Sequence, residues 1–128
     1  HPPSLIRPGA PLVINRAALI LKYREPAVLW INEADPYGEG PGVDLESVNE
    51  ERTVYLISDH DADSPTAVDA WLALNFRALF EDELEGWYMD PALWPQDITL
   101  ALFHAWFEVE CHTVVVDTVG GPLVDDET

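Results

Sequence analysis

The sequence predicts one α+β domain, in which a small sheet of about three strands is covered by helices mainly on one face. Three apolar runs of strand length, at 17–24, 52–58 and 109–117, alternate with segments whose apolar residues recur at helical spacing. The chain of 128 residues is 48% hydrophobic and contains five Trp, so it can bury one core. The predicted order within residues 17–117 is β-α-β-α-α-β.

The first third of the chain predicts an extended lead-in, a strand and a short helix. Residues 1–16 form the lead-in, because prolines at positions 2, 3, 8 and 11 keep the chain extended or turning. The strand 17–24 ends at Glu25-Pro26, and Pro26 suits the first turn of a helix. Asp35-Pro36 ends this helix, whose apolar face consists of Ala27, Val28, Trp30 and Ile31.

The middle of the chain predicts a short capped helix, a second strand and one long helix. Asp44 can cap a helical turn that extends to Asn49, and 52–58 predicts a largely buried strand. Ser64-Pro65 is typical of a helix start and Gly86 of a helix end. Between them, residues at three- and four-residue spacing predict a helix of about five turns: Val68, Leu72, Phe76, Leu79, Phe80 and Leu84.

The last third predicts an aromatic loop, a buried helix, a strand and a tail. Residues 87–97 form the loop, since Pro91 and Pro95 interrupt regular structure. Residues 98–108 are apolar on most sides, so we expect a largely buried helix there. The strand 109–117 places Cys111 on one face and His112 on the other. Residues 118–128 predict a flexible acidic tail.

The chain is strongly and unevenly acidic. It has 24 acidic and 6 basic residues, a formal net charge of −18. Residues 1–52 hold five basic and eight acidic side chains (net −3), whereas 53–128 hold only Arg77 against sixteen acidic ones (net −15). Direct binding to nucleic acid or to an anionic membrane needs Lys and Arg contacts, so the composition argues against both. A basic protein partner is favoured instead.

Several features predict a soluble cytoplasmic protein. No stretch approaches the roughly 20 apolar residues of a membrane span, and residues 1–4 lack the charged start and apolar core of a signal peptide. Cys111 is the only cysteine, so no intrachain disulfide can form, which suits a reducing compartment.

Two groups of residues resemble metal ligands, and neither completes a site. The alternating carboxylates of 59–63 match the start of a calcium loop, but Ser64 and Ala70 stand where glycine and glutamate are required. These acids also favour the positive end of the helix that follows them. The second group, His104, Glu108, Glu110, Cys111 and His112, crosses from helix to strand, so no set of three ligands is assured. The sequence predicts no metal and no cofactor.

No pattern of residues indicates catalysis. The chain contains no Gly-x-Ser-x-Gly, no His-Glu-x-x-His and no glycine-rich phosphate loop followed by lysine. Close carboxylate pairs are almost inevitable among two dozen acids, so such a pair alone says little about acid–base chemistry. The sequence therefore favours a non-catalytic protein and supplies no catalytic residue.

The most distinctive surface candidate lies around the end of the long helix. The acidic charges there are Glu81, Asp82, Glu83, Glu85 and Asp90, and the aromatic anchors are Trp87, Tyr88 and Trp94. Large aromatics beside acids are typical of a surface that anchors a partner, and negative charge at a helix C-terminus is locally unfavourable. The alternatives are that the aromatic loop caps the core and that the acids form an ordinary solvated helix face.

The same region carries a resemblance. A group of short acidic bacterial proteins of uncharacterised function is similar to this chain at Leu84-Glu85-Gly86-Trp87, Asp90, Leu93-Trp94-Pro95 and the pattern Phe103-x-x-Trp106-Phe107-x-Val109-Glu110-x-His112. The resemblance covers about the last half of the chain. It implies a bacterial cytosolic origin and assigns no catalytic or binding residue.

The leading functional hypothesis is a non-catalytic interaction protein whose acidic surface binds a basic protein partner, with nucleic-acid mimicry as one form of that binding. The alternative is a small-ligand or metal-binding protein, with enzymatic activity as one version, that uses a pocket between the sheet and the aromatic loop with His104, His112 or residues 59–63. A third reading is a stable domain whose charge has no binding role.

Overall fold

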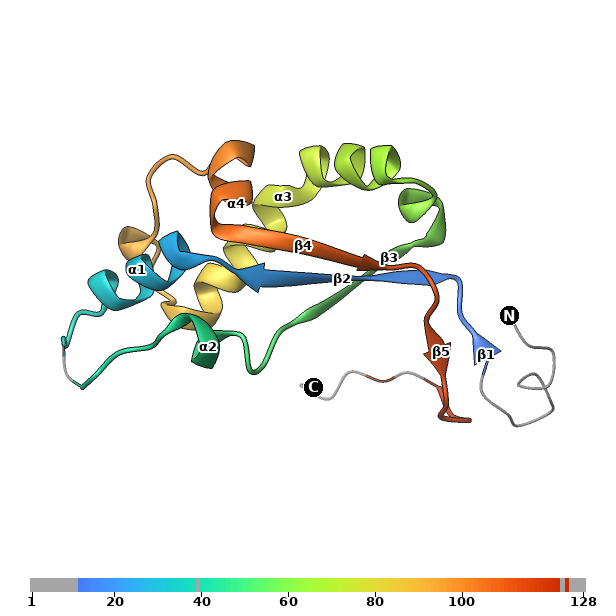
Figure 1. The fold of residues 1–128 in the computed structure, drawn as a ribbon, viewed down its shortest axis with the longest axis horizontal. Helices are drawn as coiled ribbons and strands as arrows, with labels where there is room; N and C mark the ends of the chain where they lie inside the picture. Colours follow the sequence, from blue (N-terminus) through green and yellow to red (C-terminus); the bar gives the residue numbers. More distant parts are fainter. Residues whose placement is uncertain (1–11, 39, 123, 125–128) are drawn as a thin grey trace.

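The core of the protein is a three-stranded antiparallel sheet with helices packed on one face, which confirms the predicted α+β class (Figure 1). The computed structural model describes residues 12–38, 40–122 and 124. Strand β2 (Arg16–Tyr23) lies in the centre, between β3 (Val54–Ser58) and β4 (Phe107–His112). The sequence did not specify this order, in which the central strand comes first along the chain.

The two faces of β2 differ because successive side chains point to opposite sides of a strand. Ala17, Leu19, Leu21 and Tyr23 are buried, whereas Arg16 and Lys22 on the other face are exposed. Helices α3 (Pro65–Trp87) and α4 (Leu100–Trp106) cover the buried face. Phe80, Phe103 and Phe107 are fully buried between these layers.

Helix α1 (Glu25–Ala34) begins at Glu25-Pro26 and is followed by a loop that leads to α2 (Leu45–Val48). Asn32 holds this loop in place: its side chain donates to the Val43 carbonyl and accepts from the Val43 N–H, both at 2.9 Å. Gly42 is required there, since its φ is +77° and a Cβ would lie 2.4 Å from Asn32 Oδ1. The predicted cap of α2 is confirmed, because the Asp44 carboxylate accepts from the Ser47 N–H at 2.7 Å.

The long helix α3 starts as predicted. The Ser64 hydroxyl accepts from the Ala67 N–H at 3.1 Å, and Pro65 occupies the first turn. The helix continues one residue past Gly86 and ends at Trp87, because Tyr88 turns to an extended conformation while its N–H still donates to the Leu84 carbonyl. Before α3, residues Asp59–Ala62 form a 3-10 turn (η2).

The prediction of a helix over 98–108 was wrong at its end. Thr99 caps α4, which stops at Trp106, and Phe107 already belongs to β4. The cause is pairing with the far end of β2: Phe107 lies opposite Tyr23, and the Arg24 N–H donates to the Trp106 carbonyl at 2.7 Å. Distant pairing therefore overrides the local helical pattern.

The predicted strand 109–117 is divided into two. Strand β4 ends at His112, and β5 (Val116–Asp117) pairs instead with β1 (Leu12–Val13) to form a separate two-stranded ribbon (Figure 1). The predicted lead-in thus contributes a short strand, while residues 1–11 lie outside the described residues. In the predicted tail, 118–122 and 124 have no helix or strand, and the rest also lies outside the described residues. None of the helices in the described part of the chain combines the length and the apolar composition that a membrane crossing requires.

Candidate functional site: an acidic pocket at the end of the sheet

A network of aromatic and acidic side chains joins the C-terminal half of α3 to the sheet. The Tyr23 hydroxyl of β2 donates to Glu83 Oε1 at 2.7 Å and accepts from Trp87 Nε1 at 2.8 Å. The Tyr55 hydroxyl of β3 is shared between Glu83 Oε2, at a short distance, and Asp82 Oδ2 at 2.7 Å. One carboxylate, that of Glu83, is therefore held between two phenols from neighbouring strands.

The two phenols stay protonated well above neutral pH. Burial, followed by the charge of Glu83, raises the pKa of Tyr23 above its usual value near 10. Burial and the hydrogen bonds to Glu83 and Asp82 raise the pKa of Tyr55 in the same direction. A protonated phenol can donate, so these tyrosines keep the carboxylate of Glu83 fixed in one position.

Next to this network lies a cavity of about 180 Å³, the acidic pocket, lined by Tyr23, Val48, Glu51, Thr53, Asp82, Glu83, Gly86 and Trp87. Its lining contains three carboxylates and no Lys or Arg side chain. Glu51 and Asp82 are exposed at its rim, and Glu83 is half-buried.

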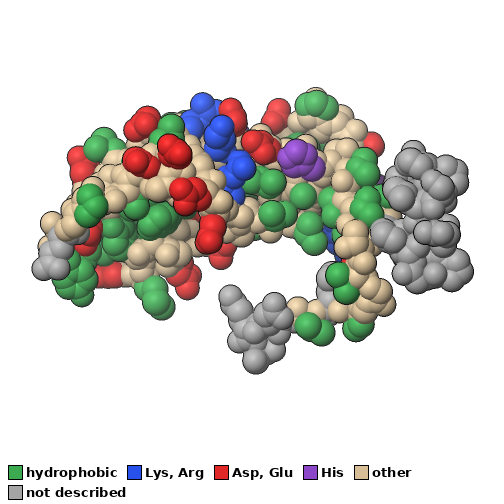
Figure 2. All heavy atoms as spheres, turned by 60° about the horizontal axis from the view of Figure 1, so that its bottom comes forward, with side chains coloured by type: hydrophobic (Ala, Val, Ile, Leu, Met, Phe, Trp, Pro, Cys, Tyr) green, Lys and Arg blue, Asp and Glu red, His purple; other side chains and the backbone are tan. Residues whose placement is uncertain are grey.

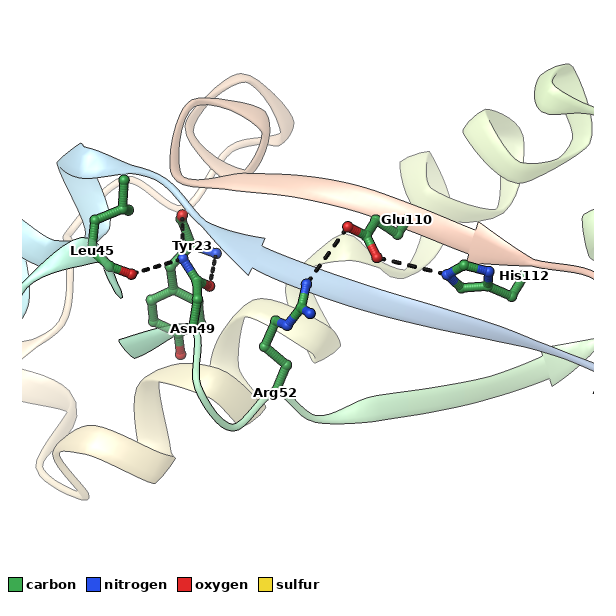
Figure 3. A network of polar contacts seen from close by, with 6 residues as sticks. All are labelled: Tyr23, Leu45, Asn49, Arg52, Glu110 and His112. Atoms are coloured by element: carbon green, nitrogen blue, oxygen red, sulfur yellow. Dashed lines mark hydrogen bonds and ion pairs between the residues drawn. The ribbon is translucent and has the colours of Figure 1, made fainter. Parts of the chain in front are cut away.

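Asn49 positions the strand end that borders the acidic pocket (Figure 3). Its amide nitrogen donates to the carbonyls of Tyr23 at 3.2 Å and Leu45 at 3.0 Å, and its amide oxygen accepts from the Tyr23 N–H at 2.9 Å. The side chain thus replaces a strand neighbour that β3 no longer supplies at this point. It ties α2, and the segment with Glu51 that follows, to the end of β2.

The open face of the sheet carries a second polar group, also seen in Figure 3. Glu110 of β4 lies 3.6 Å from Arg52 Nη1 through one oxygen and 3.6 Å from His112 Nε2 through the other. Arg52 reaches across β2 to make this pair. The space-filling view toward this side of the molecule shows hydrophobic side chains gathered beside basic and acidic ones (Figure 2). The prediction that the strand within 52–58 is largely buried was wrong: only Ile57 of β3 is buried, because Val54 and Leu56, half exposed, lie on this uncovered face.

The aromatic loop closes one end of the core. Trp30 Nε1 of α1 donates to the Leu93 carbonyl at 3.0 Å, and Trp94 Nε1 donates to the Tyr88 carbonyl at 2.7 Å. The Tyr88 hydroxyl donates to the carbonyl of Ile31, and its ring packs edge-on against Trp30 at 5.3 Å. Trp87, Tyr88 and Trp94 are half-buried. Their role as anchors stays a prediction, and each offers only part of its surface to a partner.

The structure brings three of the eight predicted site residues into the acidic pocket: Asp82, Glu83 and Trp87. Glu81 lies outside it and pairs with Arg77 at 3.4 Å. Glu85 is exposed, and Asp90 caps the turn Pro91–Leu93 (η3) by accepting from the Ala92 N–H at 3.0 Å. Sequence reasoning missed Tyr23, Glu51 and Tyr55. The alternation of Leu19, Leu21 and Tyr23 could have placed Tyr23 inward, but no local pattern pairs it with Glu83.

Of the residues named for the alternative ligand site, His104 and Asp63 line one cavity and His112 lies apart from them. The gap between the sheet and the aromatic loop, lined in part by Trp30, Trp87 and Trp106, is filled by side chains and has no room for water. His104 lines a different cavity between α3 and β4, while His112 lies on the open face of the sheet with Glu110. In the described part of the chain, no group of three or more His, Cys, Asp and Glu side chains is arranged to hold a metal ion.

Comparisons of the chain with protein-family models, with curated proteins and with solved structures found no match.

Proposed function

We propose that the protein is a non-catalytic interaction protein that binds a basic protein partner, and that the acidic pocket receives a lysine or arginine side chain of that partner. The observation that carries this proposal is the lining of the pocket, which includes the carboxylates of Glu51, Asp82 and Glu83 and no Lys or Arg side chain. A cationic side chain would supply the missing charge.

The geometry suits such a ligand in two ways. Tyr23 and Trp87 form aromatic walls, and a cation gains about 0.5–2 kcal/mol over an aromatic face. The phenols of Tyr23 and Tyr55 also hold Glu83 in place before binding. A preorganised carboxylate loses little side-chain freedom when the cation arrives, which favours affinity.

The acidic residues around the pocket extend the negative electrostatic potential of its three carboxylates. Glu81, Glu85 and Asp90 lie on or near the end of α3, and in the described chain only Glu81 and Glu110 pair with an arginine within 4 Å. Such a field speeds encounter with a basic surface, and salt weakens it. In the mimic form of the proposal, these carboxylates take the place of nucleic-acid phosphates on the partner. We place the interaction in the cytoplasm, because the only cysteine, Cys111, has no intrachain disulfide partner, and the bacterial origin rests on the resemblance to short acidic bacterial proteins.

The test compares two variants that remove the same amount of charge. Glu51→Gln with Asp82→Asn neutralises the pocket and leaves Glu83 in place. Glu33→Gln with Asp97→Asn neutralises exposed acids elsewhere. Partners captured from a bacterial lysate by the wild-type protein are identified, and the binding of each purified partner is measured by calorimetry at two salt concentrations.

We expect the pocket variant to weaken binding of a basic partner by about tenfold, or about 1.4 kcal/mol, and the matched variant to weaken it far less. Binding that is equal in both variants and insensitive to salt would overturn the proposal. For the mimic form, the protein must also displace nucleic acid from the partner.

A further inference from the structure

The outer edge of β4 presents main-chain groups that the sheet does not use. In an antiparallel pair, alternate residues direct their N–H and C=O groups toward the neighbour. The bond from the Arg24 N–H to the Trp106 carbonyl shows which residues of the two strands bond to each other. Two and four residues further along, Lys22 lies opposite Glu108 and Ile20 lies opposite Glu110. The groups of Glu108 and Glu110 therefore face β2, and those of Val109 and Cys111 face away.

The pairing of β2 with β3, on its other side, confirms this alternation of bonded residues. The Asp59 N–H donates to the Asn15 carbonyl, so the odd-numbered residues of β2 bond to β3 and the even-numbered ones to β4. Strand β4 is an edge strand of the sheet. Among the described residues, no hydrogen bond outside the strand ladders involves the N–H or C=O of Val109 or Cys111.

A groove runs along this edge. The cavity there has a volume of about 540 Å³ and lies between β4 and the N-terminal half of α3, which passes above β4 in Figure 1. The α3 wall consists of Pro65, Val68, Asp69 and Leu72, which share one helix face. The strand wall consists of Val109, Cys111 and Thr113, and His104 with Arg24 closes one end.

The groove has the shape and polarity for one extended segment. At about 3.3 Å per residue, the edge from 108 to 113 matches roughly five residues of a strand. The apolar surface of the groove that solvent can reach comes from Pro65, Val109 and Cys111, whereas Val68 and Leu72 are buried in the core. A strand added there would direct alternate side chains to this apolar surface and bond to the N–H and C=O groups of β4 that face the groove.

The charges of the groove select a basic segment. Asp63, Asp69 and Glu108 line it, against Arg24 as the one Lys or Arg side chain among its lining residues. The chain as a whole carries a formal charge of −18, which repels an acidic segment and a second copy of the chain alike.

We propose that this groove binds an extended, basic segment of another protein as an additional strand beside β4, with apolar side chains against Pro65, Val109 and Cys111 and basic ones near Asp63 and Asp69. This site is separate from the acidic pocket, so it goes beyond the function proposed above and stands if that pocket has no role.

The probe is a short capped peptide in which valine and lysine alternate. Amide hydrogen exchange is followed by NMR with and without the peptide. We expect the peptide, at ten times its Kd, to slow the exchange of the Val109 and Cys111 amides by about tenfold. The amides of Glu108 and Glu110, already bonded to β2, serve as internal controls. The thiol of Cys111, the only one in the chain, should also react more slowly with a maleimide.

Two modified peptides test strand addition itself. One is N-methylated on its valine nitrogens and the other on its lysine nitrogens, so each has lost the donors of one edge. We expect one of them to lose binding and the other to keep it, because a strand beside β4 bonds through one edge only. Equal binding of the two would overturn the proposal.

Two protein variants locate the peptide. Asp69→Lys in the groove and Glu51→Gln with Asp82→Asn in the acidic pocket each change the net charge by +2. We expect the first to weaken peptide binding at least fivefold and the second to leave it nearly unchanged. The reverse result would assign the peptide to the acidic pocket and overturn the groove. Protection of the Val109 and Cys111 amides without peptide would also overturn it: concentration-dependent protection would identify a second copy as the occupant, and constant protection a segment of the same chain.

Discussion

The two ends of α3 meet the sheet in different ways. At its C-terminal end, Glu83 bonds to Tyr23 and Tyr55, and its carboxylate is fixed by side-chain donors from two strands. At its N-terminal end, the helix stands apart from β4, and main-chain groups of the strand that face the groove between them have no partner among the described residues. One end therefore presents positioned charge, and the other presents unused backbone bonding capacity.

This difference teaches how one helix can support two kinds of recognition. A pocket of carboxylates acts through charge, which depends on salt and on the protonation of its neighbours. An exposed strand edge acts through backbone hydrogen bonds, which any extended segment can make, so selectivity comes from the side chains along the groove. We therefore expect the two ends of α3 to contribute to the free energy of unfolding through different interactions, the C-terminal end through the Glu83 network and the N-terminal end through its cap.

The largest expected effect comes from the C-terminal end. Glu83→Ala removes the carboxylate that accepts from both phenols; it leaves Tyr23 without an acceptor and Tyr55 with Asp82 alone. We expect a loss of about 2 kcal/mol in the free energy of unfolding. Urea unfolding measures it. Glu85→Ala in the same helix is the matched control, since Glu85 is exposed. Similar losses in the two variants would show that the tyrosine network does not stabilise the fold.

The network should also weaken the fold in alkaline solution. The pKa values of Tyr23 and Tyr55 are raised on folding, so above about pH 10 the folded state retains protons that the unfolded state releases. Stability is complete below pH 10 and falls as pH rises further, by up to about 1.4 kcal/mol per pH unit for each tyrosine, and by less for the half-exposed Tyr55. Urea unfolding between about pH 8 and about pH 11 measures the slope. It should become shallower in Tyr23→Phe and in Tyr55→Phe, and an unchanged slope in both would contradict this account.

At the N-terminal end of α3, we expect the helix cap to contribute more to the free energy of unfolding than any charged side chain does. Ser64→Ala removes the acceptor of the Ala67 N–H, and we expect a loss of about 1 kcal/mol in thermal or urea unfolding. Ser64→Asp keeps an acceptor and should restore most of that stability. If neither variant differs from wild type, α3 does not depend on its cap.

The smallest effect should come from the surface ion pair between Arg77 and Glu81. Both side chains are largely solvated, so Glu81→Gln should cost less than about 0.5 kcal/mol, and high salt should abolish the difference. A cost as large as that of Glu83→Ala would mean that charge alone, without the tyrosines, stabilises this end of the helix.

The features predicted correctly from the sequence are those that neighbouring residues determine. Ser64-Pro65 marks the start of α3 and Asp44 that of α2, because a cap and its N–H partner lie within one turn. The short apolar run at the start of 17–24, which ends at Glu25-Pro26, likewise marks the strand β2. The end of α4 depends on Phe107 lying opposite Tyr23, and no local pattern carries that information.

The candidate site shows the same limit. Asp82, Glu83 and Trp87 are close in the sequence and were predicted together. Tyr23 and Glu51 reach the pocket, and Tyr55 reaches Glu83, only through the pairing of distant strands. The sequence allows two interpretations of the aromatic loop, a surface that anchors a partner and a cap of the core, because composition does not reveal hydrogen-bond partners. The bonds from Trp30 and Trp94 show that it packs over the core.

The position of β2 also constrains how the protein is made. The central strand is synthesised early, but one of its two neighbours, β4, is translated almost a whole domain later. Until then β2 can pair only with β3, and the aromatic residues of α3 lack Phe103 and Phe107 to pack against. Until β4 is made, this apolar strand and helix can associate with those of another copy of the chain, and the negative charge that both copies carry opposes that association.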